Sequence, residues 1–271
     1  MRLELKFGDS VIELFVFGNG PKKLIAFHGF DNEAQEFEPL YTLLAEYTLI
    51  SVNLYFHGGS FASSEHVQAG LNDANFIQLH KQIFERFPAD QYDLIGYSLG
   101  GRIALWLYEL QSKKIGKIIL LAPDGLKPTG LYRFVTRNYF GKKLFQRVVT
   151  NPTRIIKLGE LMVRFRMLPE KKFRFLKYNL ENQMRRDKVY NTWMIYRFAI
   201  PNLPLIKSFL KAEDKKAYLF FGKWDVLMPP SLGNTFKKDV ADNCEVNIID
   251  TGHQLISEKN LKAIAEILNR V

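Results

Sequence analysis

Ser98 lies in a glycine-rich segment whose spacing is typical of a nucleophilic serine. The segment Gly96-Tyr97-Ser98-Leu99-Gly100-Gly101 stands between an apolar run that predicts a buried strand and a pattern that predicts a helix. Side chains two residues to either side of the serine would collide on so sharp a turn, and glycine at positions 96 and 100 removes that collision. Such a turn raises the hydroxyl at the carboxyl edge of a sheet, beside a helix N-terminus that favours a developing oxyanion. The competing interpretation is that Ser98 is only a helix N-cap.

A serine hydroxyl is a poor nucleophile at neutral pH, so the sequence must also supply a base and a group that orients the base. His253 follows an apolar run at Val246–Ile249, and Asp225 follows another at Tyr218–Phe221. Both side chains therefore leave the carboxyl ends of predicted strands, which is the edge where Ser98 is expected. We predict Ser98 as the nucleophile, His253 as the general base and Asp225 as the acid that orients the histidine.

Other residues compete for the roles of base and acid. Asp124 follows the predicted strand Ile115–Leu121, one strand earlier in the chain than the strand that precedes Asp225, so it is a rival for the acid. His28 and His57 precede the serine, which does not fit the chain order of serine, acid and histidine. His66 lies in a polar stretch and His80 in a helical pattern, so both are predicted to be solvated surface residues.

The same chemistry needs two hydrogen-bond donors for an oxyanion. One is expected to be the backbone N–H of Leu99, the residue after the serine. His28-Gly29-Phe30 follows an earlier apolar run, and the glycine lets the backbone turn toward the site. We predict the backbone N–H groups of Phe30 and Leu99 as the substrate-binding oxyanion hole, with His28 as an organiser of its loop.

The elements that must position these residues alternate along the chain. Short apolar runs alternate with longer helical patterns, as in an α/β fold with a mostly parallel sheet covered by helices on both faces. The predicted strands are Leu3–Phe7, Val11–Phe17, Leu24–Phe27, Thr48–Leu54, Tyr92–Gly96, Ile115–Leu121, Ala217–Phe221 and Val246–Ile249. The predicted helices that pack on them are Phe37–Tyr47, Asn72–Phe87, Leu99–Leu110 and Leu261–Leu268.

The alternation stops in the middle of the chain. From Gly125 to Pro204 the pattern predicts successive helices, broken at Pro152, Pro169 and Pro201. We interpret residues 125–216 as an inserted helical cap or lid, and residues 1–124 and 217–271 as the core that carries the sheet.

Composition limits the class of protein. The chain has 271 residues, close to the upper size of one hydrophobic core, and its 47% hydrophobic and 24% charged residues are typical of a soluble globular protein. Cys244 is the only cysteine, which rules out an intramolecular disulfide and favours a cytoplasmic location. No metal-ligand spacing and no nucleotide-binding glycine motif is present, so we expect neither metal nor cofactor.

Charge divides the chain unevenly. Residues 125–216 contain 22 Lys and Arg against 6 Asp and Glu, whereas the rest of the chain contains 16 against 22. Runs such as Arg164-Phe165-Arg166 and Lys171-Lys172-Phe173-Arg174-Phe175 interleave cations with aromatic residues. This pattern suits anionic lipid headgroups, an anionic acyl substrate or an acidic partner, and it also fits a solvated helix face. No nucleic-acid reading module is visible, so we expect no nucleic-acid partner.

The order of these motifs resembles that of the α/β-hydrolase superfamily. The matching pieces are His28-Gly29, Gly96-Tyr97-Ser98-Leu99-Gly100, Asp225 with Pro229 after it, and Gly252-His253. The resemblance implies an eight-stranded sheet, a helical cap between the sixth and seventh strands, and hydrolysis through a covalent acyl-serine without a cofactor. Many members have an aspartate-led segment where this chain has Asn53–Ser60, which leaves the subfamily open. Serine at position 98 argues against the haloalkane dehalogenase and epoxide hydrolase branches, which use an aspartate nucleophile.

The sequence therefore predicts a serine hydrolase that acts on a carboxylic ester or thioester, with a small-molecule acyl substrate whose acyl group stays open. Hydrolysis of a C–C bond and acyl transfer are neighbouring chemistries on the same serine. The alternative from another class is a non-catalytic protein of the same fold, which binds an anionic membrane or partner through the basic cap.

Overall fold

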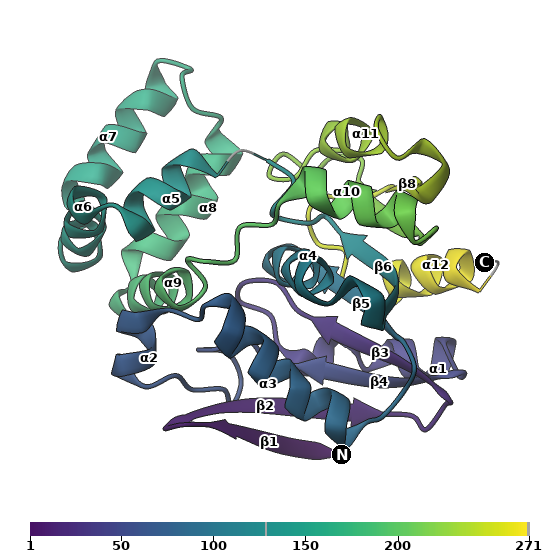
Figure 1. Ribbon diagram of the computed structural model, residues 1–271. Helices are drawn as coiled ribbons and strands as arrows, with labels where there is room; N and C mark the ends of the chain where they lie inside the picture. The colour runs from purple at the N-terminus through teal and green to yellow at the C-terminus, as the bar shows by residue number, and fades with distance from the viewer. Residues whose placement is uncertain (128, 270–271) are drawn as a thin grey trace. The chain divides into compact units, whose positions relative to one another are not determined.

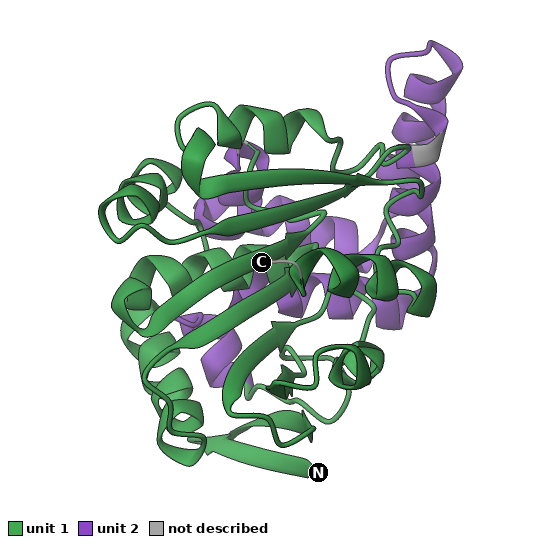
Figure 2. Ribbon diagram, turned by 90° about the vertical axis from the view of Figure 1, so that its right-hand side faces the viewer, with its two compact units in different colours: residues 1–63, 72–128, 199–271 green, residues 64–71, 129–198 purple. Residues whose placement is uncertain are grey.

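The computed structural model describes residues 1–127 and 129–269. Contacts within the chain divide it into two compact units, drawn in different colours in Figure 2. The core unit comprises Met1–Ser63, Asn72–Pro128 and Ala199–Val271, and the helical unit comprises Ser64–Leu71 and Thr129–Phe198. The predicted insertion spanned residues 125–216, whereas the contact-defined helical unit is shorter at both ends and also includes the 64–71 segment.

The core unit is built on one eight-stranded sheet, which confirms the predicted α/β fold class (Figure 1). Its spatial order is β1-β2-β4-β3-β5-β6-β7-β8. The first two strands join the sheet antiparallel, and every pairing from β4 onward is parallel. The bounds are β1 (Arg2–Phe7), β2 (Ser10–Phe17), β3 (Lys22–Phe27), β4 (Tyr47–Val52), β5 (Tyr92–Tyr97), β6 (Ile115–Leu121), β7 (Ala217–Gly222) and β8 (Cys244–Ile249).

Helices cover both faces of this sheet, which explains why its central strands are continuous apolar runs. On one face, α1 (Pro39–Leu43) packs against α12 (Glu258–Leu268), and residues such as Leu40 and Ile264 join the main core cluster. On the other face lie α3 (Asp73–Arg86) and α4 (Leu99–Gln111), whose Phe76 and Trp106 rings stack 3.8 Å apart. Because α4 is buried along most of its length, it is a rigid support for the residue that precedes it, Ser98.

The remaining helices of the core unit are α10 (Leu203–Ala212) and α11 (Ser231–Lys237), with three short 3-10 turns at Ala34–Phe37, Ser112–Lys114 and Ala241–Asn243. The helix predicted over Phe37–Tyr47 is wrong in its extent. A 3-10 turn occupies its start, and α1 ends at Leu43 before the chain enters β4. The pattern also missed α11, whose seven residues are too short to show a helical period.

The helical unit contains α2 (Ser64–Ala69), α5 (Gly130–Arg137), α6 (Tyr139–Thr150), α7 (Thr153–Arg164), α8 (Glu170–Glu181) and α9 (Gln183–Ile195). Pro152 and Pro169 stand at the N-caps of α7 and α8, as the predicted breaks required. The Arg197 guanidinium donates hydrogen bonds to the carbonyls of Val67, Gln68 and Ala69 at the end of α2. This contact places residues 64–71, far away in sequence, in the same unit.

Within the described residues, no helix is both long and apolar enough to cross a membrane.

The prediction that His80 is a solvated surface residue is wrong. His80 lies on the inner face of α3, is 2% exposed, and contacts the rings of Phe76 and Phe27. Nδ1 of its ring donates to the carbonyl of Phe76, while Nε2 has no hydrogen-bond partner among the described residues. Burial lowers the pKa of His80 to about 4, so the folded protein keeps this ring neutral.

Because the buried ring of His80 stays neutral, we expect the folded protein to lose stability in mild acid. Below pH ~6.5 the unfolded chain protonates His80 but the folded chain does not, so the stability present above pH ~6.5 falls as the pH is lowered toward 4. A shift of this size corresponds to about 3 kcal/mol. Urea unfolding across this pH range is expected to show a flatter pH dependence for His80→Phe than for the wild type. Equal slopes in the two proteins would contradict a neutral buried ring.

Candidate active site

Ser98 occupies a strained turn between β5 and α4. Its backbone dihedrals are φ 50° and ψ −114°, a region that side-chain-bearing residues rarely adopt. A Cβ atom on Gly96 would lie 2.4 Å from the carbonyl oxygen of Gly100, and one on Gly100 would lie 1.9 Å from that of Phe27. The predicted steric reason is therefore confirmed for Gly96, whose clash lies within the turn, whereas Gly100 is required by the backbone at the end of β3. Although Ser98 stands at the N-cap position of α4, its side chain makes no capping hydrogen bond.

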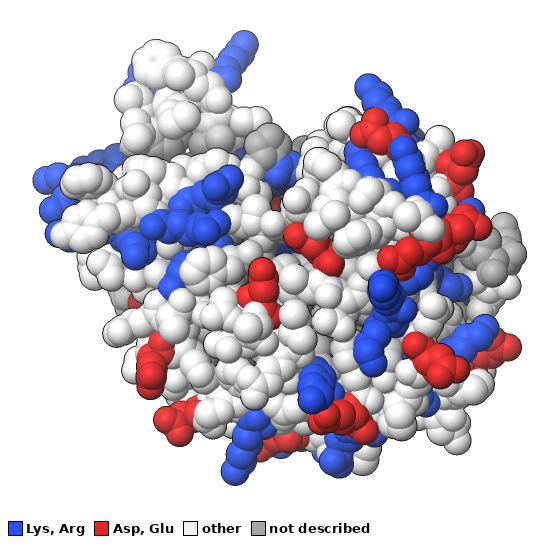
Figure 3. Space-filling model, in the orientation of Figure 1, with Lys and Arg blue, Asp and Glu red and all other residues white. Residues whose placement is uncertain are grey.

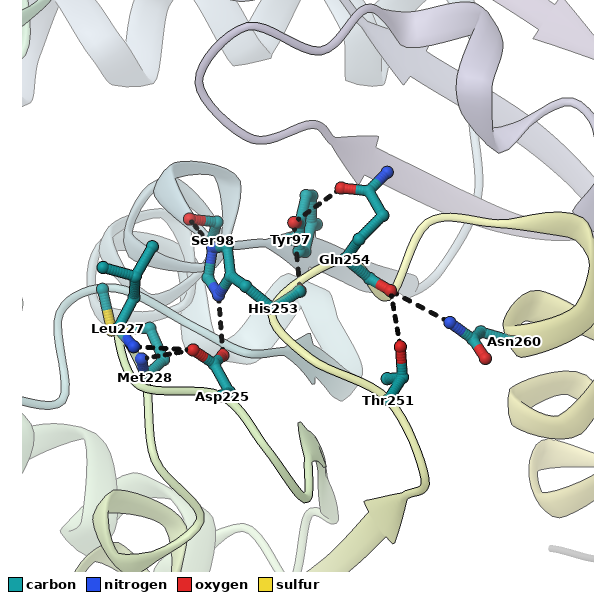
Figure 4. A network of polar contacts seen from close by, with 9 residues as sticks. All are labelled: Tyr97, Ser98, Asp225, Leu227, Met228, Thr251, His253, Gln254 and Asn260. Atoms are coloured by element: carbon teal, nitrogen blue, oxygen red, sulfur yellow. Dashed lines mark hydrogen bonds and ion pairs between the residues drawn. The ribbon is translucent and has the colours of Figure 1, made fainter. Parts of the chain in front are cut away.

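The Ser98 hydroxyl instead begins a chain of hydrogen bonds (Figure 4). Its Oγ lies 3.1 Å from Nε2 of His253, and Nδ1 of His253 lies 2.6 Å from Oδ2 of Asp225. The other carboxylate oxygen, Oδ1, accepts hydrogen bonds from the backbone N–H groups of Leu227 and Met228 at 2.8 and 2.9 Å. The Asp225 carboxylate is completely buried, whereas the His253 side chain is 24% exposed. Because a carboxylate can only accept a hydrogen bond, Nδ1 of His253 carries the ring proton and donates it to Oδ2 of Asp225. Nε2 of His253 is then the nitrogen that accepts the serine proton.

Two neighbouring loops hold the acid and the histidine together. The parallel pairing of β7 and β8 continues past the strands, since Lys223 N–H donates to the carbonyl of Ile249 and Trp224 N–H to that of Thr251. A Cβ atom on Gly222 would lie 1.8 Å from the carbonyl oxygen of Gly252, so only glycine permits this approach. The register of one strand pair thus places residues 225 and 253 side by side.

Asp124, the rival acid, contacts a different side chain. Its carboxylate forms an ion pair with Arg102 of α4, and the two side chains are 16% and 6% exposed. The Asp124 backbone N–H donates to the carbonyl of Ser98 at 2.8 Å, which ties this segment to the strained turn. Of the two aspartates, Asp225 is the one that the structure brings to His253.

The loop after β3 lies against the start of α4. The contact of Gly100 with the backbone of Phe27 extends to the carbonyl of His28, so the loop passes next to the first turn of the helix. Leu99 is the first residue of α4, and the first N–H groups of a helix have no partner within it. This placement is compatible with the predicted donors, Phe30 and Leu99.

His28 and His57 hold that loop in place through hydrogen bonds and a ring contact. His28 is fully buried, and its Nε2 accepts a hydrogen bond from Leu54 N–H at 2.9 Å. Nε2 of His57 accepts from Asp31 N–H at 3.3 Å, and the His57 ring meets the Phe30 ring edge-on. The segment Asn53–Ser60, where the sequence departs from the pattern of many α/β-hydrolases, therefore supports the loop that carries Phe30.

Buried Glu13 in turn fixes the Asn53–Ser60 segment. Its carboxylate accepts hydrogen bonds from the Asn53 side chain and from Gly59 N–H. Burial acts to raise the pKa of Glu13, but these bonds and the Arg2 guanidinium hold that pKa below its usual value. Glu13 therefore stays a charged acceptor for both donors.

Sequence comparison identifies the family of the chain. The model of the alpha/beta hydrolase fold family matches residues 23–260, which include Ser98, Asp225 and His253. The chain belongs to this family. Over its whole length this α/β hydrolase also superimposes on the thioesterase domain from the curacin biosynthetic pathway, with a TM-score of 0.66, 16% identity, and coverage of 100% of this chain and 99% of that one.

Two curated relatives match this α/β hydrolase over part of their length. A Mycoplasma pneumoniae protein named as an esterase/lipase is 30% identical over 133 residues, which are 48% of each chain. A 2-succinyl-6-hydroxy-2,4-cyclohexadiene-1-carboxylate synthase from Yersinia enterocolitica is 32% identical over 105 residues, which are 38% of this chain and 35% of that protein. The chain thus spans about a third to a half of the length of these relatives.

Tyr97 is a residue of this site to which the motif around Ser98 assigned no role. Its hydroxyl lies 3.1 Å from the carbonyl oxygen of His253 and 3.2 Å from Oε1 of Gln254, so it donates to the histidine loop (Figure 4). Burial raises the pKa of Tyr97, and the charges of Asp225 and Glu36 raise it further, so the hydroxyl keeps its proton. The strand that ends at Tyr97, one residue before Ser98, thereby also holds the backbone of His253. The only signal in the sequence was an aromatic residue next to the serine.

The backbone of the histidine loop has a second set of contacts. The carbonyl of Gln254 accepts from the Asn260 side chain at 3.0 Å and from the Thr251 hydroxyl at 3.4 Å (Figure 4).

Within residues 1–127 and 129–269, no group of three His, Cys, Asp or Glu side chains could hold a metal ion.

Proposed function

We propose that this α/β hydrolase cleaves a carboxylic ester or thioester through an acyl intermediate on Ser98. The observation that carries the proposal is the continuous hydrogen-bonded chain from Ser98 through His253 to buried Asp225, at the carboxyl edge of a parallel sheet. A nucleophile, a base within hydrogen-bond distance and a third group that orients the base are the arrangement that activates a serine hydroxyl.

The proposed reaction has two steps. In the first, Ser98 Oγ forms a bond to the acyl carbon while Nε2 of His253 takes the hydroxyl proton, and Asp225 stabilises the imidazolium. The backbone N–H groups of Phe30 and Leu99 stabilise the oxyanion, and His253 returns the proton to the departing alcohol or thiol. In the second step the oxygen of a water molecule forms a bond to the acyl carbon while Nε2 of His253 takes a proton from it. The bond between the acyl carbon and Ser98 Oγ then breaks, and His253 returns the proton to Oγ, which releases the carboxylic acid and free Ser98.

The relatives support hydrolysis without fixing the substrate. The Mycoplasma pneumoniae protein bears an esterase/lipase name, which fits the proposed chemistry. The Yersinia enterocolitica protein is named as a synthase, so the test must also detect chemistry other than hydrolysis. C–C bond hydrolysis and acyl transfer use the same serine and are separated from ester hydrolysis by their products.

The experiment that tests the proposal is labelling of the purified chain with a fluorophosphonate, followed by a panel of acyl esters and thioesters. We expect covalent attachment of one probe, located at Ser98 by peptide mass spectrometry, and parallel loss of turnover on the best substrate. An added alcohol as competing acceptor distinguishes acyl transfer, because its ester would then form in preference to the free acid. Turnover that survives complete labelling of Ser98, or a chain that neither labels nor turns over any substrate, would contradict the proposal.

A further inference from the structure

The helical unit exposes an unusual amount of apolar surface. Of the 20 large hydrophobic side chains exposed in the described part of the chain, 13 belong to residues 129–198. They are Leu131, Phe134, Tyr139, Phe140, Leu144, Leu158, Leu161, Phe165, Met167, Phe175, Leu176, Tyr178 and Met184. Single exposed apolar residues are ordinary, but a concentration of this kind indicates an interaction surface.

On α7 the exposed apolar residues form one stripe. Gly159 marks the inner side, because a Cβ atom there would lie 2.2 Å from the Phe173 ring of α8. At about 100° per residue, Leu161 and Phe165 fall on the opposite side of the helix from Gly159, with Leu158 beside them. These three side chains are 48%, 65% and 50% exposed. Besides the side that packs against α8, the α7 helix therefore has an exposed apolar stripe that no described element covers.

Cations flank this stripe and a similar one on α6. Arg154, Lys157 and Arg164 are exposed along the α7 stripe. On α6, Phe140 and Leu144 are 73% and 51% exposed, and Lys143 and Arg147 lie beside them at helical spacing. We call these ten residues the α6–α7 face: Phe140, Lys143, Leu144, Arg147, Arg154, Lys157, Leu158, Leu161, Arg164 and Phe165.

The cations of the α6–α7 face have no acidic partner within 4 Å among the described residues. The one acid of α5–α7, Glu160, forms an ion pair with Lys177 of α8 at 3.0 Å. The helical unit as a whole has 17 Lys and Arg against 5 Asp and Glu. In Figure 3, blue side chains gather over the helices of this unit with little red among them.

We propose that the α6–α7 face binds the surface of a lipid bilayer that contains anionic headgroups. Cations interleaved with Leu and Phe match such a surface, because the cations meet the headgroup charge while the apolar side chains enter the headgroup and acyl boundary. A nucleic acid would leave the apolar stripes exposed, and a second copy of the chain would oppose the same positive charge. A solvated surface gains nothing from three large apolar side chains in one stripe. The lipid surface is the occupant that uses both features.

Co-sedimentation of the full chain with vesicles tests this inference independently of any activity. We expect binding to vesicles of phosphatidylcholine mixed with phosphatidylglycerol, and little binding to phosphatidylcholine alone. The electrostatic part of the attraction should weaken as salt rises from 0.1 M to 1 M, because the Debye length falls from about 10 Å to about 3 Å.

Two variants separate charge from insertion. Arg154→Gln, Lys157→Gln and Arg164→Gln together should lower the partition coefficient about a hundredfold, since each cation near the surface contributes about 1 kcal/mol. Leu158→Ser, Leu161→Ser and Phe165→Ser together should weaken the binding that remains at high salt. Hydrolysis of a small soluble ester should be unchanged in both variants, which also reports that the core unit is folded.

The matched control removes three exposed cations from the core unit, by Lys6→Gln, Lys259→Gln and Lys262→Gln. It carries the same net charge as the first variant but keeps the α6–α7 face, so it should bind the mixed vesicles almost as the wild type does. If the control loses as much vesicle binding as the first variant, the net charge of the protein, and not the α6–α7 face, governs the binding. No preference for anionic vesicles in the wild type, or unaltered binding by the apolar variant at 1 M salt, would also overturn the inference. Lys171 is left out of the design because its side chain lies outside the described part of the structure.

Discussion

Ser98→Ala is expected to reduce ester turnover by up to about a million-fold, the loss seen when a serine of this kind is removed from a cooperating set of three residues. His253 would still be held by Asp225 at 2.6 Å, but it would have no hydroxyl to deprotonate. The measurement is kcat/KM on the best ester of the panel, with protein free of contaminating esterase. Turnover unchanged in purified Ser98→Ala protein would remove Ser98 from the mechanism.

The strained backbone of Ser98 supplies a control for this experiment. Ser98→Gly removes the same hydroxyl but also relieves the cost of holding a side-chain-bearing residue at φ 50°, a cost of about 1–3 kcal/mol. The two variants should be equally inactive, while Ser98→Gly unfolds at a higher urea concentration than Ser98→Ala. Equal inactivity in two variants of different stability would assign the lost turnover to the hydroxyl rather than to unfolding. Restored activity in either variant would contradict the assignment.

The candidate site could be predicted from sequence as far as local sterics and strand ends determine it. Glycine at 96 is required by a contact within the turn itself, so the motif alone indicates the turn, whereas glycine at 100 is required by the backbone of Phe27 and His28, far away in sequence. The position of His253 and Asp225 after parallel strands indicates the edge at which they meet. The ion pair of Asp124 with Arg102 could not be predicted, because it depends on which way two side chains point. The contact of Tyr97 with His253 joins residues 156 positions apart, and no short pattern encodes it.

The fold was predictable where burial produces a pattern and not where elements are short. The central strands are continuous apolar runs because helices cover both faces of the sheet, whereas β1 alternates exposed charged and apolar residues. The α2 helix has six residues and none is buried, so it leaves no apolar period in the sequence. For His80 the period was present, since Phe76, His80 and Ile83 share one face at helical spacing, so the spacing indicates burial here more reliably than the residue type.

Asp225→Asn is expected to lower turnover about ten-thousandfold. An asparagine can keep its oxygen on the N–H groups of Leu227 and Met228, which turns its amide NH₂ toward His253. Nδ1 of His253 must then accept, so the proton moves to Nε2, where it blocks deprotonation of Ser98. The fold should change little, because the hydrogen bonds of Oδ1 persist. Steady-state kinetics and urea unfolding on the same preparation measure both effects.

Asp124→Asn is the matched comparison, because it makes the same chemical change in the other aspartate that follows a strand. Its cost should fall on stability, since the nearly buried guanidinium of Arg102 loses its counter-charge, and breaking such a pair costs about 3 kcal/mol. Turnover per folded molecule should stay close to that of the wild type, because the Asp225 and His253 contact is untouched. A large loss of turnover in Asp124→Asn, with nearly full activity in Asp225→Asn, would move the orienting acid to the end of β6. The same result would mean that the contact between Asp225 and His253 is rearranged when substrate binds.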